Sequence, residues 1–175
     1  RQRQMCIRDS YISSLDNAVY GHAYTSVFGA GTSASEFEFL TGNSMAFLPS
    51  GSIPYQQYIK AETPSMASHL ASLGYKTVAM HPYKASGWDR NKVYPNLGFQ
   101  EMHFLPDYKN PLLVREYVSD KSDFEKIIET YEKKEPGEPL FVFNVTMQNH
   151  SSYTESFDNF RPDITVEGAN STALN

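Results

Sequence analysis

A glycine-rich turn at residues 29–31 leads into a segment that begins with the hydroxyl residue Thr32. Residues 32–40 have a spacing typical of a helix, whose N-terminus offers backbone N–H groups and a positive dipole to an anion. A hydroxyl at that point, assisted by a metal ion, is placed to attack or hold a phosphoryl group. The simpler interpretation is that Thr32 or Ser33 caps the helix after a flexible turn. Spacing alone favours the cap.

A second candidate group lies at residues 81–90, with the sequence HPYKASGWDR. His81 follows a predicted strand, and Trp88 and Arg90 add an aromatic face and a guanidinium. Together these side chains would make a polar pocket for a phosphate and a polyol. The alternative is that His81 lies on a surface loop and Trp88 packs on the rim of the sheet.

His150 is the third candidate, because it follows Asn149 after the most apolar segment of the chain, residues 139–147. Ligand sites in open α/β sheets lie beyond the carboxyl ends of the strands, so a histidine in this position is expected to face a cleft. His81 follows a strand in the same way. The sequence contains no HExxH, zinc-finger, Walker or GxSxG pattern that would indicate another chemistry.

The elements that must position these residues alternate between strand-like and helix-like segments, which is typical of an α/β fold with a mostly parallel sheet. Residues 18–28 are expected to be extended, and residues 75–80 to form a short buried strand. Residues 139–147 are apolar on both faces, as expected of a central parallel strand.

Two helices are predicted beside these strands. In residues 63–74, Thr63 is the expected cap, Pro64 takes the first helical position, and Gly74 ends the helix in a left-handed conformation. A second helix is predicted at residues 122–132. There Ser122 and Glu125 form a capping box, and the apolar face consists of Phe124, Ile127, Ile128 and Tyr131.

Composition narrows the classes of partner. The formal net charge of −5 argues against nucleic acid, since no basic stripe is available to neutralise phosphates. No apolar run is long enough to span a membrane. Residues 1–10 are polar and aperiodic, are interpreted as a non-native segment, and contain the single cysteine, Cys6. The remaining chain therefore has no residue for a disulfide or a thiolate site.

Residues 26–42, SVFGAGTSASEFEFLTG, resemble the nucleophile segment of the lipoteichoic acid synthase family. The resemblance implies that Thr32 is the nucleophile and also a metal ligand. The segment with His81, Trp88 and Arg90 resembles the part of the family that contacts the glycerol phosphate head group. Asn149-His150 is similar to a further active-site motif. The motifs occur in the family's order and cover most of residues 16–153.

By this resemblance, residues 11–175 are expected to be part of a sulfatase-like or alkaline phosphatase-like catalytic domain, with a mixed, mostly parallel sheet flanked by helices. The chain is expected to be an internal fragment of an extracellular domain, incomplete and inactive by itself. The family's metal site also requires a Glu upstream and an Asp-His pair downstream, and neither is identified here. Thr32 is thus the one ligand predicted for a divalent metal, expected to be manganese.

The implied reaction moves glycerol phosphate from phosphatidylglycerol to a cell-surface polymer through a threonine-linked intermediate, with His150 assisting. The expected location is the outer side of the cell membrane of a Gram-positive-type bacterium, with membrane contact through other parts of the protein. Two alternatives stay open. One is a sulfatase or phosphodiesterase acting on another ester. The other is a non-catalytic domain that binds glycerol phosphate.

Overall fold

The computed structural model describes residues 14–17, 19, 21–22, 24–27, 31–151, 153 and 155–161. The segment at residues 1–10, interpreted as non-native, lies outside the described residues, and so does part of the predicted extended segment at residues 18–28. The described residues of that extended segment are not assigned to a strand. The described residues also include no helix that is long and apolar enough to cross a membrane.

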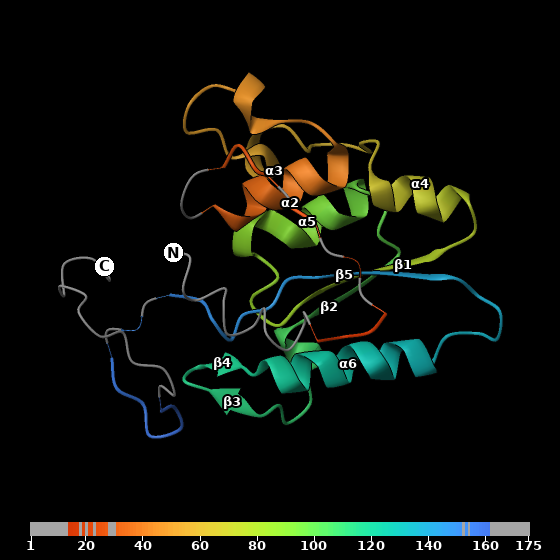
Figure 1. Cartoon of the computed structure of the whole chain (residues 1–175). Helices are drawn as coiled ribbons and strands as arrows, with labels where there is room; N and C mark the ends of the chain where they lie inside the picture. The colour runs from red at the N-terminus through yellow and green to blue at the C-terminus, as the bar shows by residue number, and fades with distance from the viewer. Residues whose placement is uncertain are drawn as a thin grey trace.

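A parallel sheet of three strands forms the centre of the described structure (Figure 1). Strand β1 (Lys76–His81) lies between β2 (Glu101–Phe104) and β5 (Leu140–Asn144), and both pairings are parallel. The predicted parallel α/β architecture is therefore confirmed. The predicted central position of residues 139–147 in the sheet is not confirmed. The observed strand, β5, is shorter and lies at the edge of the described sheet, where it is only half-buried.

Helices cover both faces of this sheet, and Figure 1 shows one group above it and a single helix below. The upper group contains α2 (Thr32–Thr41), α3 (Pro54–Gln57), α4 (Met66–Ser72) and α5 (Arg90–Asn96). Helix α6 (Asp120–Glu132) lies on the opposite face. Short 3-10 turns occupy Met45–Phe47, Gly87–Asp89 and Leu105–Asp107, and a small antiparallel ribbon joins β3 (Leu113–Val114) to β4 (Tyr117–Val118).

The main core lies between the upper helices and the sheet. Tyr94 is at its centre: its ring meets those of Phe99 and Tyr55 edge-on at 5.3 and 6.3 Å and stacks on Phe104 at 6.2 Å. Aromatic pairs of this kind are worth about 1 kcal/mol each beyond the area that they bury. The cluster fixes α2 and α5 against each other, and its members are Phe37, Leu40, Tyr55, Ile59, Ala67, Ala79, Val93, Tyr94, Leu97, Phe99 and Phe104.

The predicted caps of α4 and α6 were wrong by two and three residues, respectively. Helix α4 begins at Met66, and Ser65 is the N-cap in a reciprocal capping box with Ser68. Helix α6 begins at Asp120, because the Ser119 side chain accepts a hydrogen bond from the backbone N–H of Ser122. The end of α4 is as predicted, since Gly74 has a φ of +89°.

Helix α6 packs a polar face against the sheet, not the predicted apolar one. Asp123 is fully buried and accepts hydrogen bonds of 2.7 Å from both Tyr108 Oη and Asn144 Nδ2. Burial raises the pKa of Asp123. Phe124, Ile128 and Tyr131 are exposed in the described structure. Hydrogen bonds with Tyr108, which follows the turn after β2, and with Asn144 on β5 therefore set the orientation of this helix.

Candidate active site

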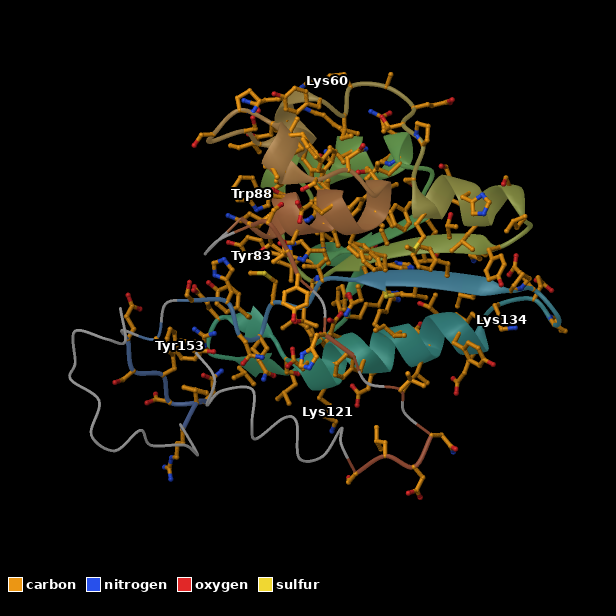
Figure 2. All side chains as sticks on the ribbon, turned by 45° about the horizontal axis from the view of Figure 1, so that its top comes forward. Lys60, Tyr83, Trp88, Lys121, Lys134 and Tyr153 are labelled. Atoms are coloured by element: carbon orange, nitrogen blue, oxygen red, sulfur yellow. The ribbon has the colours of Figure 1, made fainter. Side chains whose placement is uncertain are left out.

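All five residues singled out in the sequence line a single pocket of about 300 Å³. This volume is at the lower end of the range for small-ligand sites. The pocket lies at the start of α2 and beyond the carboxyl ends of β1 and β5, as ligand sites of parallel sheets do. Figure 2 shows Trp88 and Tyr83 at this end of the molecule. The lining residues are Thr32, His81, Tyr83, Gly87, Trp88, Arg90, Val145, Thr146, Met147, Asn149 and His150.

Thr32 is the first residue of α2, and its side chain does not cap the helix. The N-cap is Gly31, whose φ of 100° is readily adopted only by glycine, and no side-chain cap is formed. The first turn closes with a bond from Ala34 N–H to Gly31 O. The N–H groups of Thr32 and Ser33 precede that bond and have no acceptor within the helix. An exposed hydroxyl therefore stands beside amides that favour an anion.

His81 ends β1 and is almost fully buried, with 2 % of its surface exposed. Its Nδ1 lies 2.8 Å from the carbonyl oxygen of Val145. Because a carbonyl only accepts, Nδ1 carries the proton and Nε2 is left as an acceptor. Burial, together with the nearby charge of Arg90, lowers the pKa of His81 to about 4. At neutral pH the ring is uncharged, so it offers an acceptor suited to a ligand hydroxyl.

Trp88 and Asp89 both have left-handed backbone conformations, with φ values of 56° and 57°. Such conformations cost non-glycine residues roughly 1–3 kcal/mol each and persist only where the surrounding structure enforces them. Here the turn is closed by hydrogen bonds from Gly87 N–H to Lys84 O and from Asp89 N–H to Ser86 O. The strained pair places the partly exposed indole of Trp88 in the pocket lining. The buried Arg90 follows directly after Asp89.

Arg90 is 2 % exposed and bonds to the carboxylate of Glu36 on α2, which was not predicted as a site residue. Its Nε donates to Glu36 Oε2 at 3.2 Å, Nη2 donates to Glu36 Oε1, and Nη1 donates to Gly87 O at 3.2 Å. Glu36 also accepts hydrogen bonds from Tyr55 and Tyr94 at 3.1 and 3.0 Å. Burial and the negative charge of Glu36 raise the pKa of both tyrosines.

The second residue that the sequence analysis missed is Arg115, which holds the loop after β5. Its Nη2 donates to the carbonyl oxygens of Gln148 and His150 at 2.6 and 2.7 Å. The guanidinium also lies 4.1 Å from the centre of the Tyr153 ring. His150 itself is exposed and packs its ring against Tyr117 at 5.5 Å. Its placement thus depends on its backbone, on the ring contact with Tyr117 and on a long hydrogen bond of 3.4 Å between Tyr117 Oη and its Nδ1.

The described residues contain no group of three or more His, Cys, Asp or Glu side chains that could hold a metal ion. Thr32 alone does not satisfy a divalent cation, which requires several oxygen or nitrogen ligands. The described part of the chain therefore does not form a complete cation site. Members of the alkaline phosphatase and sulfatase superfamily generally use a divalent metal.

The profile of the Sulfatase family matches residues 10–169, and the chain belongs to this family of enzymes. Within it, the fold is that of the lipoteichoic acid synthase-like phosphoglycerol transferases, as the sequence resemblance predicted. The phosphoglycerol transferase GacH of Streptococcus pyogenes, solved with sn-glycerol-1-phosphate, is 29 % identical with a TM-score of 0.63, over 77 % of this chain and 36 % of GacH. The lipoteichoic acid synthase LtaP of Listeria monocytogenes is 22 % identical with a TM-score of 0.60, over 73 % of this chain and 31 % of LtaP, which shows a shared fold.

A similar sequence comes from Rhizobium meliloti. This protein, assigned to cyclic beta-1,2-glucan modification, is 39 % identical over 150 residues, which is 85 % of this chain and 23 % of the relative. The chain thus spans about a quarter of this relative and about a third of the two solved structures.

Proposed function

We propose that the protein transfers glycerol phosphate from phosphatidylglycerol to a cell-surface polymer through an intermediate linked to Thr32. The observation that carries the proposal is the convergence of Thr32, His81, Trp88, Arg90 and His150 on one pocket. The similarity to a phosphoglycerol transferase solved with sn-glycerol-1-phosphate supports the same ligand chemistry. We place the catalytic domain on the outer side of the cell membrane, attached through other parts of the protein.

In this proposal the head group binds at the start of α2. Arg90 and the N–H groups of Thr32 and Ser33 bind the phosphate, since all are donors suited to an anion. The neutral His81 accepts a hydrogen bond from a glycerol hydroxyl through Nε2, and Trp88 covers the glycerol. This arrangement explains why the histidine is kept uncharged next to an arginine.

The transfer has two steps. The Thr32 hydroxyl gives up its proton to solvent and its oxygen attacks phosphorus, the bond to the diacylglycerol oxygen breaks, and the diacylglycerol leaves with a proton from His150. A hydroxyl of the acceptor then attacks the same phosphorus, and the Thr32 oxygen leaves and regains a proton. In this proposal His150, which lines the same pocket, gives the first proton and takes one from the acceptor. Thr32, together with ligands outside the described residues, would hold a divalent cation, proposed to be manganese, whose charge would stabilise the deprotonated threonine.

A glucan is a second candidate acceptor. The relative assigned to cyclic beta-1,2-glucan modification is 39 % identical to this chain, more than either solved transferase. A sugar hydroxyl and a glycerol phosphate hydroxyl attack phosphorus by the same chemistry, so the proposed reaction is compatible with either acceptor. Parallel assays with the two acceptors separate them.

The direct test is transfer from radiolabelled phosphatidylglycerol by the full-length protein. Thr32→Ala should abolish transfer, because no other described hydroxyl stands at the start of α2 in the pocket. Thr41→Ala is the matched control, since Thr41 ends the same helix and its hydroxyl donates to Phe37 O. Transfer that survives Thr32→Ala contradicts the proposal. Release of free glycerol phosphate to water alone would instead favour a phosphodiesterase, and cation-independent binding without turnover would favour a binding domain.

A further inference from the structure

The guanidinium of Arg90 is bound so that only part of it is left for a ligand. Arginine has five N–H donors, one on Nε and two on each Nη nitrogen. Glu36 takes the donor on Nε and one on Nη2, and Gly87 O takes one on Nη1. Among the described residues, one donor on Nη1 and one on Nη2 have no hydrogen-bond acceptor. Paired N–H groups of this kind are the fork with which arginine binds two oxygens of a phosphate.

Glu36 is held as firmly as the arginine that it binds. It is 4 % exposed, and both of its oxygens accept from Arg90. Tyr55 and Tyr94 donate to Oε2 from α3 and α5, within the aromatic core. A carboxylate with this many donors has one orientation, and it transmits that orientation to the guanidinium.

The sequence spacing connects this pair to the proposed nucleophile. Thr32 and Glu36 are four residues apart on α2, so both project from the same face of the helix one turn apart. The hydroxyl that attacks and the carboxylate that orients the phosphate-binding arginine therefore belong to one rigid element. Any rotation of α2 would move both together.

We propose that Glu36 is a positioning residue that aims the free N–H fork of Arg90 at the donor phosphate and keeps it in register with Thr32. This inference rests on the proposed function, because the phosphate is that of the glycerol phosphate head group. Arg90 makes the contact and Glu36 acts through it. The effect should appear in ground-state recognition of the head group and not in the chemical step.

The test uses the full-length protein, with kinetics on phosphatidylglycerol and calorimetric binding of sn-glycerol-1-phosphate. Glu36→Asp keeps the charge and withdraws the carboxylate by one methylene. We expect the KM for the donor and the Kd for sn-glycerol-1-phosphate to rise at least tenfold, with kcat within about threefold. Glu38→Asp is the matched control, because Glu38 lies on the same helix and accepts from Ser44 and Met45, outside the pocket. Its KM and Kd should not change.

A second variant covers the case in which Glu36→Asp does not fold. Tyr55→Phe removes a single donor to Glu36 Oε2 and leaves the charge pair intact. It should raise the same KM by about two- to fivefold, and not at all in an Arg90→Lys background, where the fork is already lost. A lower melting temperature with unchanged KM and Kd in both single variants would overturn the proposal and leave Glu36 a structural residue. If the wild-type protein neither binds sn-glycerol-1-phosphate nor uses phosphatidylglycerol, the proposed function fails before the positioning role is reached.

Discussion

The two arginines beside the pocket are fixed in different ways. Arg90 is neutralised by the buried carboxylate of Glu36 and is tied through it to the aromatic core. Arg115 binds main-chain oxygens of Gln148 and His150 from a left-handed backbone position, with a φ of 57°. Asn159 secures that position by bonding to both the N–H and the carbonyl of Arg115.

Because of this difference, we expect the Arg90 side of the pocket to be rigid and the Arg115 side to be adaptable. A buried ion pair has one low-energy geometry, because any displacement leaves a charge unpaired in the interior. A loop held by its carbonyls keeps its backbone path while its side chains stay exposed, as Asn149 and His150 do. In the proposed transfer, the fixed side would recognise the invariant head group, and the looser side would accommodate the leaving group and the acceptor.

The largest expected effect is on stability and compares two carboxylates of α2. Glu36→Gln should lower the free energy of unfolding by about 3–5 kcal/mol, since it leaves the buried Arg90 without its counter-charge. Glu38→Gln should cost about 1 kcal/mol, the loss of ordinary hydrogen bonds at a less buried carboxylate. Urea denaturation measures both. Equal losses of unfolding free energy in the two variants would show that burial of the Glu36–Arg90 ion pair does not increase its contribution to stability.

The next effect concerns pH and tests the neutral state of His81. The pKa of His81 is about 4 in the folded protein against an ordinary value of 6.5. The unfolded chain therefore binds the proton first, and the stability that this neutral ring contributes is complete above pH 6.5. It should be lost as the pH falls from about 6.5 to 4, by roughly 3 kcal/mol.

His81→Asn keeps a donor for the Val145 carbonyl and removes the titrating group. Its unfolding free energy should fall less steeply over this pH range. His69→Asn is the control, because His69 is exposed on α4. An unchanged slope in His81→Asn, or the same flattening in His69→Asn, would contradict the assigned pKa.

A smaller effect, seen in catalysis, tests the Arg115 side. Arg115→Met removes the donors to the carbonyls of Gln148 and His150 and should lower kcat about tenfold, or roughly 1.4 kcal/mol, through a displaced His150. The KM for the donor should change less than about twofold. Arg115→Lys should recover part of the loss. A rise in KM with unchanged kcat would mean that both arginines act on the head group, and the contrast between the two sides would be lost.

The smallest expected effect is a gain in stability at the strained turn. Asp89→Gly relieves a left-handed conformation and should raise the free energy of unfolding by about 1 kcal/mol. The exposed ion pair with Lys92, at 3.3 Å, contributes little to stability. Lys92→Gln measures that contribution separately, by thermal unfolding. A loss of stability in Asp89→Gly would show that the carboxylate, and not the backbone, stabilises this turn.

The sequence was informative where the signal is local. The parallel α/β architecture and the residues of the pocket follow from strand ends, a glycine-rich turn and short motifs, which reside in a few neighbouring residues. Glu36 and Arg115 were missed because their partners are distant: Arg90 is 54 residues from Glu36, and His150 is 35 residues from Arg115. The four-residue spacing from Thr32 was the one available signal for Glu36.

The predictions of the helix boundaries and of the buried face of α6 were wrong for a related reason. Ser65 and Ser119, not the predicted Thr63 and Ser122, supply the caps, and serine-rich stretches offer several caps within one turn. For α6, a buried aspartate bonded to Tyr108 and Asn144 decides which face meets the sheet. Periodicity alone cannot detect a polar anchor of this kind, because it counts apolar residues.

The central claim is that Thr32 carries the transferred group, and mapping the covalent adduct to a peptide by mass spectrometry tests it most directly. The full-length enzyme would be incubated with phosphatidylglycerol and without acceptor, quenched in acid, digested and mapped by mass spectrometry. A peptide containing Thr32 that is heavier by one glycerophosphoryl group, lost on addition of acceptor and not formed by Thr32→Ala, is the predicted result. Transfer to an acceptor without any adduct on Thr32, or an adduct on another residue, would contradict the account.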